Sequence, residues 1–196
     1  ISHKVRSFQR KFVFDKDITF SILVPLYNTP EKYLAEMIKS VQKQTYPKWQ
    51  LCLADGSDQA HSYVGEYVKS LNDNRICYKK LEKNMGISEN TNACIDIANG
   101  SYIALFDHDD LLHPSALFEM MKAICENNAD FIYTDEATFL GNKTSNITVC
   151  NYKPDYSPDT LRSYNYICHF TAFSRKLLDE VGRFHSECDG SQDYDL

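Results

Sequence analysis

The chain has 196 residues, of which 43% are hydrophobic and 24% charged, a balance that indicates a packed globular core rather than disorder. Its formal net charge of -6 argues against a nucleic-acid-binding surface. The seven cysteines include no C-x-x-C pair, so we expect reduced side chains rather than a disulfide framework or a zinc site. The sequence contains no run of about 18 apolar residues, so it predicts no membrane-spanning helix.

The first segment, 1–17, is basic and amphipathic. The apolar side chains Val5, Phe8, Phe12 and Val13 are interspersed with lysines and arginines. This pattern fits a helix that lies on a membrane or on a further domain, or, as we favour, a helix that flanks the main domain. We therefore divide the chain into a flanking segment, 1–17, and one domain, 18–196. Because the chain begins with Ile1 and stops inside a motif, we expect that domain to be truncated at its C-terminus.

Strands and helices are predicted to alternate along the domain. Short apolar runs predict strands over Ile18–Leu26, Trp49–Ala54, Ile76–Tyr78, Tyr102–Phe106 and Phe131–Thr134. Apolar residues at helical spacing predict intervening helices over Pro30–Gln44, Gln59–Leu71 and Pro114–Glu126, with another beginning at Asn84–Ile87. Thr29 is expected to cap the first of these helices. Beyond Gly141 we expect a loop or hairpin over 142–151, a short helix at Asp159–Tyr164, a strand at Tyr166–Phe173 and a helix from the cap Ser174 to Val181.

This alternation predicts an α/β fold in which a mostly parallel central sheet is sandwiched between helices. In such sheets ligands bind outside the carboxyl ends of the strands. Polar residues from five loops fall at these predicted ends: Asn28, Asp55, Asn84, Asp107–Asp110 and Asp135. Their convergence predicts a binding site at one edge of the sheet.

An acidic cluster follows the strand at Tyr102–Phe106. Asp107, Asp109 and Asp110 place three carboxylates within four residues, and two unit charges about 4 Å apart repel by roughly 4 kcal/mol at an effective dielectric constant of 20. Oxygen ligands at this density suit Mg²⁺ or Mn²⁺, which also bind phosphate oxygens. An acidic turn that caps the helix near Pro114 is the alternative.

The predicted ligand is a nucleotide that is held without a glycine-rich phosphate loop. The seven glycines form neither G-x-G-x-x-G nor G-x-x-x-x-G-K-[ST], so a cation at the acidic cluster is the available means of neutralising phosphates. Asp55, at the end of the second strand, could accept a hydrogen bond from the imide N–H of a pyrimidine. An ordinary turn with a helix cap is the alternative for Asp55–Asp58.

The chain resembles the family 2 glycosyltransferases, inverting enzymes with the GT-A fold. The resemblance rests on an ordered set of motifs over roughly Thr19–Leu196, and it is strongest to the bacterial branch that builds cell-surface polysaccharide. The motifs are Val24-Pro-Leu-Tyr-Asn28, Ala54-Asp-Gly-Ser-Asp58, Asn84-x-Gly-Ile-Ser88, Asn92, Gly100-x-Tyr-Ile-Ala104, Asp107-His-Asp-Asp110 and Gly190-Ser-Gln-Asp-Tyr-Asp-Leu196.

The resemblance implies a role for each matching residue. It implies that Asp193 is the general base, that Asp109 is the direct metal ligand, and that Asp107 faces the ribose or a metal-bound water while Asp110 shares the metal. It also implies a donor-nucleotide site formed by Pro25, Tyr27, Asn28, Asp55, Asn84, Asn92 and Asp107. Two positions depart from the family pattern: Ala54 stands where a second aspartate is frequent, and Gln192 replaces the glutamate before Asp193.

The implied activity is transfer of a sugar from a UDP- or dTDP-linked donor to a hydroxyl of a glycan or lipid-linked glycan, with Mn²⁺ or Mg²⁺ as cofactor. The implied location is the cytoplasm, with peripheral association at the inner face of the plasma membrane as a further expectation. Two other functions stay open: a sugar nucleotidyltransferase and an inactive domain that binds nucleotide sugars. Against the first, Pro25–Pro30 lacks the glycines and lysine of the loop that such enzymes use.

Overall fold

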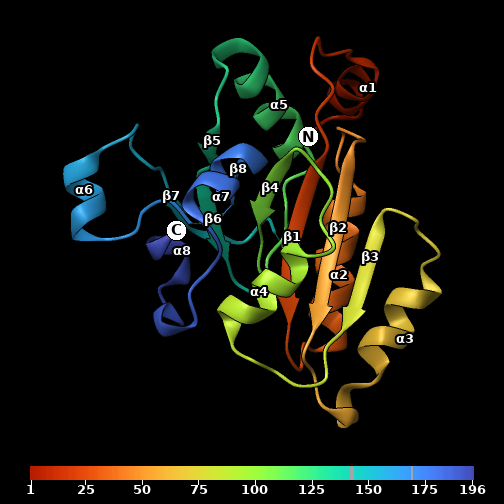
Figure 1. The fold of residues 1–196 in the computed structure, drawn as a ribbon. Helices are drawn as coiled ribbons and strands as arrows, with labels where there is room; N and C mark the ends of the chain where they lie inside the picture. The colour runs from red at the N-terminus through yellow and green to blue at the C-terminus, as the bar shows by residue number, and fades with distance from the viewer. Residues whose placement is uncertain (142–143, 169) are drawn as a thin grey trace.

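The computed structural model describes residues 1–141, 144–168 and 170–196, and its centre is a six-stranded sheet (Figure 1). The sheet has the order β3-β2-β1-β4-β8-β5. Its strands are β1 (Phe20–Leu26), β2 (Trp49–Asp55), β3 (Ile76–Lys80), β4 (Tyr102–Leu105), β5 (Phe131–Tyr133) and β8 (Thr171–Ser174). Strands β1 to β4 pair in parallel, whereas β8 is antiparallel to both β4 and β5. Consequently β5 runs in the same direction as the four parallel strands.

Helices cover both faces of this sheet. Alternate residues of a strand point to opposite sides, and both sets are apolar here, so each face has to be buried. On one face Ile22 and Val24 pack with α2 (Glu31–Gln42), α3 (Tyr63–Ser70) and α5 (Ala116–Asn127). On the other face Leu23 packs with α4 (Ile87–Ile95) and α7 (Arg175–Val181). The expected α/β sandwich with a mostly parallel sheet is therefore confirmed, and strands that are apolar on both faces are its signature.

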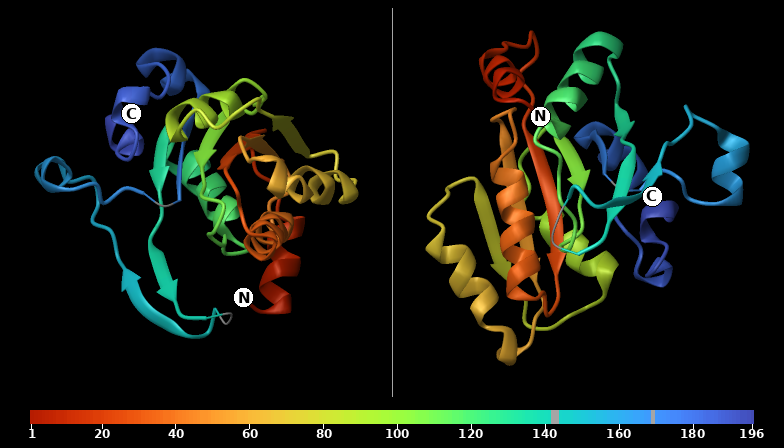
Figure 2. Two further views of the ribbon diagram at one scale, coloured as in Figure 1. Left: turned by 90° about the horizontal axis from the view of Figure 1, so that it is seen from below. Right: turned by 180° about the vertical axis from the view of Figure 1, so that it is seen from behind.

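Apart from β8 and α7, the chain beyond β5 lies to one side of the sandwich (Figure 1). Strands β6 (Glu136–Phe139) and β7 (Ile147–Asn151) form a separate antiparallel hairpin. A hairpin was one of the two structures expected over 142–151, the other being a loop. Residues 142–143 lie outside the described residues. Helix α6 (Pro158–Ser163) projects away from the sheet (Figure 2). The short helix α8 (Gln192–Asp195) follows the turn η2 (Ser186–Cys188) and lies near the sheet.

Helix α1 (His3–Lys11) lies at the opposite end of the molecule, beside the amino ends of the strands (Figure 1). The carboxamide of Gln9 fixes it to the body: Gln9 Oε1 accepts from Ser115 Oγ at 2.8 Å and from Thr45 Oγ1 at 3.0 Å. Phe12 adds an edge-on ring contact with Phe118. The apolar side chains on the other side of the helix are left at the surface.

Three local expectations need correction. Thr29 does not cap α2, because Pro30 occupies the cap position and the Thr29 hydroxyl is buried without a hydrogen-bond partner. The helix expected over Gln59–Leu71 is divided into a 3₁₀ turn, η1 (Gln59–His61), and α3. The strand expected from Tyr166 begins only at Thr171, where pairing with β4 becomes possible.

Candidate functional site

The carboxyl ends of β1, β2, β3, β4 and β5 meet at one edge of the sheet, as the alternation of elements predicted. A cavity of about 460 Å³ opens there. Pro25, Asp107 and Asp193 lie in its wall together with apolar residues, among which are Leu105, Phe131, Tyr133, Phe173, Phe184 and Tyr194. Residues that are separated by more than 160 positions in the sequence are therefore brought to a common hollow.

The Asp55 carboxylate is buried, with only 1% of its side chain exposed. Its Oδ1 accepts from the Ser57 backbone N–H at 2.8 Å, and its Oδ2 accepts from Tyr78 Oη at 2.6 Å and from Lys80 Nζ at 3.2 Å. Burial by itself would raise the pKa of Asp55, but the hydrogen bonds from Ser57, Tyr78 and Lys80 outweigh burial and hold the pKa below its ordinary value. Asp55 is thus an ionised carboxylate inside a protein network.

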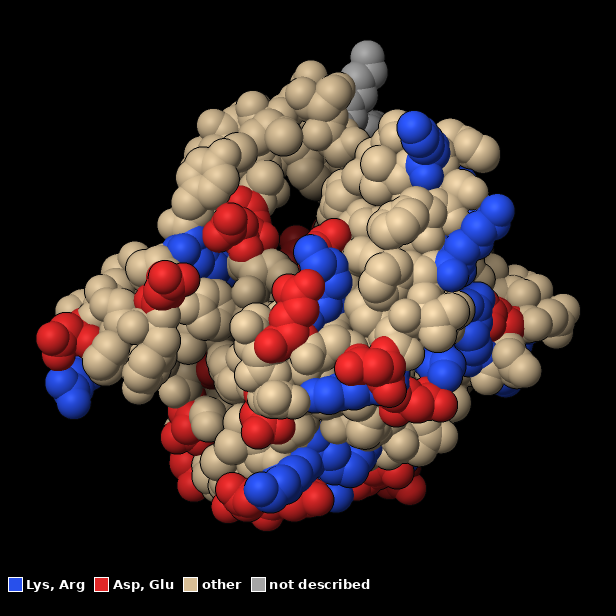
Figure 3. All heavy atoms as spheres, turned by 90° about the horizontal axis from the view of Figure 1, so that it is seen from above, with Lys and Arg blue, Asp and Glu red and all other residues tan. Residues whose placement is uncertain are grey.

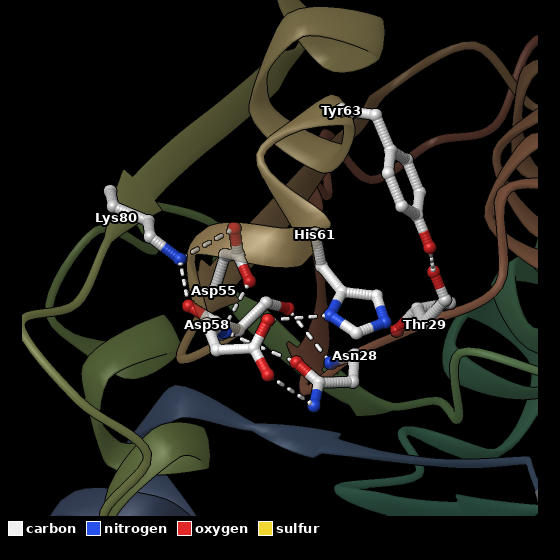
Figure 4. Close-up of polar contacts among 8 residues, drawn as sticks. Asn28, Thr29, Asp55, Asp58, His61, Tyr63 and Lys80 are labelled. Carbon is white, nitrogen blue, oxygen red and sulfur yellow. Dashed lines mark hydrogen bonds and ion pairs between the residues drawn. The ribbon is translucent and has the colours of Figure 1, made fainter.

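Asn28 joins the loop after β1 to the loop after β2 (Figure 4). It adopts the left-handed conformation, with φ of 49°, which asparagine tolerates better than most residues. Its backbone N–H donates to Ser57 Oγ at 2.8 Å, and its side chain exchanges two hydrogen bonds with Asp58. Asp58 Oδ1 lies 2.6 Å from His61 Nδ1. The preceding Tyr27 leaves half of its surface exposed at this edge.

Asn84 and Asn92 hold loops around the site. Asn84 Oδ1 accepts from Asn90 Nδ2 at 2.7 Å, and the Asn84 backbone lies so close to Gly56 that a Cβ on Gly56 would come within 2.9 Å of Asn84 Cα. The Asn92 side chain is buried and bonds the backbone N–H and carbonyl of Phe184 at 3.1 and 2.9 Å. Asn92 therefore ties α4 to the chain that leads towards α8.

The acidic cluster follows β4 as a tight turn, in which the Asp110 N–H reaches the Asp107 carbonyl at 3.4 Å. Asp107 is half-buried in the cavity wall, whereas Asp109 is exposed. Within the part of the chain that the structure describes, no three His, Cys, Asp or Glu side chains are assembled as a metal-binding group. The expected set of Asp107, Asp109 and Asp110 is thus not a ready three-ligand cage. The donor chemistry nevertheless fits Mg²⁺ or Mn²⁺, which commonly use one or two carboxylates together with substrate phosphates.

Asp193 reaches the cavity from α8, a helix of four residues. Burial, followed by a hydrogen bond to Asp193, raises the pKa of the Cys168 thiol to about 12, so Cys168 stays protonated and donates to the carboxylate. Two contacts fix the helix itself: His185 Nδ1 lies 2.7 Å from Asp195 Oδ2, and the Tyr194 hydroxyl donates to the Leu161 carbonyl.

Several residues at this edge escaped the sequence analysis. Tyr78 and Lys80 were not foreseen as partners of Asp55, although their two-residue spacing on β3 places both on one face. Lys153 was also missed: only 5% of its side chain is exposed, and its Nζ donates to the carbonyls of Ile167 and Cys168 at 3.1 and 2.7 Å. No local pattern reveals these contacts, because each depends on chain segments that meet only in the fold.

The chain is similar in sequence and fold to known proteins. The family model described as "Glycosyl transferase family 2" matches residues 21–182. An uncharacterised protein, y4gI, of Sinorhizobium fredii is 40% identical over 179 residues, which are 90% of this chain and 19% of that protein. The O-antigen biosynthesis protein RfbC of Myxococcus xanthus is 28% identical over 181 residues, covering 90% of this chain and 14% of that protein. The chain therefore spans less than a fifth of the length of these two relatives.

Solved structures agree in fold. Residues 1–349 of S. aureus TarS in complex with UDP superpose with a TM-score of 0.65 at 23% identity, covering 90% of this chain and 53% of that one. The mannosyltransferase PcManGT of Pyrobaculum calidifontis, in complex with GDP-Man and Mn²⁺, gives a TM-score of 0.66 at 15% identity and covers 97% and 56%. In the described residues, no helix has the length and apolar character needed to cross a membrane. With its sheet order, its carboxyl-edge cavity and a family match over most of its length, the chain belongs to glycosyl transferase family 2.

Proposed function

We propose that this domain is an inverting glycosyltransferase that moves a sugar from a UDP- or dTDP-linked donor to a hydroxyl of a glycan or lipid-linked glycan during cell-surface polysaccharide synthesis. One observation carries the proposal: Asp107 and Asp193 line the same cavity, and Asp109 follows at the tip of the same turn as Asp107. The O-antigen function in the name of RfbC and the UDP bound to TarS support the pathway class and the donor class.

The chemistry assigns different tasks to these carboxylates. Asp109 and Asp107, with Asp110 beside them, would hold a divalent cation, which when bound neutralises charge on the donor diphosphate. Asp193 removes the proton from the acceptor hydroxyl as that oxygen attacks the anomeric carbon from the face opposite the diphosphate. Because one base acts and no protein nucleophile intervenes, the anomeric configuration is inverted in a single displacement. The Cys168 thiol, which stays protonated, lies beside the Asp193 carboxylate.

The base assignment is tested by Asp193→Asn in the full-length protein. This variant removes the proton acceptor and nearly preserves the shape, so we expect UDP binding by calorimetry to be unchanged and sugar transfer to fall by a factor of about 100 or more. Asp179→Asn is the matched control, since Asp179 is an exposed aspartate on α7. Transfer retained in Asp193→Asn would overturn the assignment. Wild-type protein that binds donor without transferring sugar would favour the inactive binding domain, and release of inorganic pyrophosphate would favour a nucleotidyltransferase.

The metal assignment is tested by titrating UDP with and without Mn²⁺. We expect binding to require Mn²⁺ and to weaken about tenfold or more in Asp109→Ala, because the phosphates lose their cation. Equal affinity with and without Mn²⁺ would exclude a metal role in donor binding. Asp179→Ala should leave both titrations unchanged.

We also propose that α1 attaches the protein peripherally to an anionic membrane surface. Four of the 21 lysines and arginines, and none of the 27 acidic residues, lie in residues 1–14. The outward side of α1 exposes 60% of Phe8 and 42% of Val5, and beyond the helix Phe12 is 45% exposed and Val13 87%. Seen from above, the face that carries α1 shows an uncharged area bordered on one side by lysines and arginines (Figure 3). Apolar side chains beside basic ones suit an anionic lipid interface.

Co-sedimentation with vesicles tests this surface. We expect the protein to bind phosphatidylglycerol vesicles more strongly than phosphatidylcholine vesicles, and Phe8→Ser to weaken that binding. Phe131→Ser, at an exposed phenylalanine on β5 and not on α1, is the control and should bind like the wild type. Equal binding to both lipids, or no effect of Phe8→Ser, would contradict the proposal.

A further inference from the structure

Helix α4 begins at Ile87 without a capping side chain of its own. Its N-cap position is Gly86, so the free N–H groups of its first turn need an acceptor from elsewhere in the chain. Asp189 supplies one from 101 residues further along: its Oδ1 accepts from the Ser88 backbone N–H at 3.0 Å. Hydrogen bonding from Ser88 holds the pKa of Asp189 below its ordinary value, and an ionised carboxylate is favourable at the N-terminus of a helix. Asp189 is therefore the cap of α4.

Gly86 makes room for this contact. A Cβ at position 86 would overlap Asp189 Oδ2, and the φ of 94° also favours glycine. A second contact lies beside the first, since Ser88 Oγ donates to the His185 carbonyl at 2.9 Å. One turn further on, the Asn92 side chain adds its two hydrogen bonds. The first turns of α4 are thus fastened to the chain that leads towards α8.

Of these two partners, α4 is the one that the core holds. Seven of its nine residues are buried, and its Ala93 and Cys94 pack in the same cluster as Leu23 of β1. The residues of η2 and α8, in contrast, are all half-buried or exposed. Segments with few buried apolar contacts open easily unless other contacts hold them. We therefore regard α4 as the support and the chain around Asp189 as the part that is held in place.

The position of Asp189 determines that of Asp193, because a short series of turns joins the two residues. The Ser191 N–H donates to the Cys188 carbonyl at 2.8 Å, and the Tyr194 N–H donates to the Ser191 carbonyl at 2.9 Å. Helix α8, which follows at once, places Asp193 in the cavity wall, to which α4 also contributes. A shift of the Asp189 turn would consequently move the Asp193 carboxylate.

We infer that Asp189 is a positioning residue for sugar transfer, which caps α4 and thereby holds the turn that carries Asp193 at the cavity. This rests on the proposed function, in which Asp193 takes the proton of the acceptor hydroxyl. Proton removal requires the carboxylate within hydrogen-bond reach of that hydroxyl, and a displacement of about 1 Å can slow a reaction about 100-fold. The acidic cluster follows β4 instead, so the loss should affect turnover rather than donor binding.

The test uses Asp189→Ala in the full-length protein. Calorimetry with UDP and Mn²⁺ measures binding, and release of nucleoside diphosphate from the nucleotide sugar that the wild type uses measures turnover. We expect UDP affinity and donor KM to stay within about twofold of the wild type, and kcat to fall about tenfold or more. Asp189→Asn keeps an oxygen acceptor for the Ser88 N–H and should restore most of the turnover. Glu187→Ala, at an exposed acid two residues away, is the matched control and should behave like the wild type.

Unchanged turnover in Asp189→Ala would overturn the inference and leave the proposed function standing. A parallel loss of UDP affinity and turnover, with a lower melting temperature, would also overturn it, because the contact would then only support the fold. Equal damage by Asp189→Ala and Asp189→Asn would do the same, since the hydrogen bond to Ser88 would not be the cause. A wild-type protein that transfers no sugar from a UDP- or dTDP-linked donor would instead refute the proposed function.

Discussion

Gly100 stands at a point where three chain segments touch. Its N–H donates to Ser21 Oγ at 2.8 Å and its carbonyl accepts from Arg175 Nε at 2.9 Å. A Cβ at this position would lie 2.5 Å from the Thr19 carbonyl oxygen and 2.8 Å from the Ser21 nitrogen. Both neighbours are backbone atoms, next to or inside β1, that cannot rotate away. Close backbone approach, rather than an unusual φ, is thus what position 100 requires.

Gly100→Ala should therefore lower the free energy of unfolding by about 1–3 kcal/mol, the usual cost of forcing an extra methyl group into a packed interior. Urea unfolding followed by circular dichroism measures this difference. Ser101→Ala, an exposed site one residue away, is the control and should change stability by no more than about 0.5 kcal/mol. An alanine at position 100 with wild-type stability would show that β1 and the Gly100 loop can separate at little cost.

For single residues, the sequence predicted where polar side chains lie in the fold but not which residues they hydrogen-bond. Asp55 and Asn28 could be placed at the sheet edge because a polar residue directly after an apolar run marks the end of a strand. That Asp55 is enclosed by Tyr78 and Lys80 could not be seen, because it depends on the register of β2 against β3. Thr29 does not cap α2 because Pro30 takes the cap position, and the Thr29 hydroxyl is buried.

Helix α8 is linked to the preceding chain by a pair of titratable side chains, His185 and Asp195. The hydrogen bond and the charge of Asp195 raise the pKa of His185, with Glu187 adding to the effect, and His185 in turn lowers the pKa of Asp195. A raised histidine pKa in the folded state stabilises the fold below about pH 6.5, and this stabilisation is lost as the pH rises through the folded-state pKa. The lowered pKa of Asp195 stabilises the fold above the ordinary carboxyl pKa. That stabilisation is lost only as the pH falls through the folded-state pKa of Asp195, in strong acid.

We therefore expect the wild type to melt above His185→Asn near pH 6, by at most about 2–4 °C, and the two curves to converge by about pH 9. Differential scanning fluorimetry across this range provides the measurement. His3→Asn, at an exposed histidine on α1, supplies the control and should follow the wild type at every pH. A gap between wild type and His185→Asn that is independent of pH would mean that the imidazole acts by packing alone.

Elements differ in how far the sequence reveals them. The strands β1, β2 and β4 and the helices α2 and α5 were predictable because their apolar spacing reports burial on a large core. The antiparallel β8 was placed correctly in the chain but begun too early, since only Thr171–Ser174 can pair with β4. Helix α8 was not predicted as a helix at all: four residues hold one turn, and its contacts with His185 and Leu161 are long-range.

On the scale of the whole molecule, the candidate site and α1 lie at opposite ends of the sheet (Figures 1 and 2). The strands end at the cavity, and α1 packs beside the ends where they begin. A surface that attaches through α1 would consequently leave the cavity open on the far side. For this arrangement to persist, α1 must be held firmly although most of its apolar side chains face outward, and the polar contacts of Gln9 supply that attachment.

Gln9→Ala should thus lower the free energy of unfolding by about 1–3 kcal/mol, because it removes the hydrogen-bond partner of polar groups that are buried against α1. In this variant Ser115 Oγ loses its acceptor, whereas Thr45 Oγ1 still donates to the Pro114 carbonyl at 3.1 Å. The loss of stability should therefore be smaller than if both hydroxyls were left without an acceptor. Urea unfolding gives the magnitude, and limited trypsin digestion shows whether α1 is released first. Ser7→Ala, a half-buried site on the same helix, should behave like the wild type in both assays. If Gln9→Ala left stability and cleavage unchanged, Phe12 packing on Phe118 would be the contact that holds α1, and Phe12→Ala would then release it.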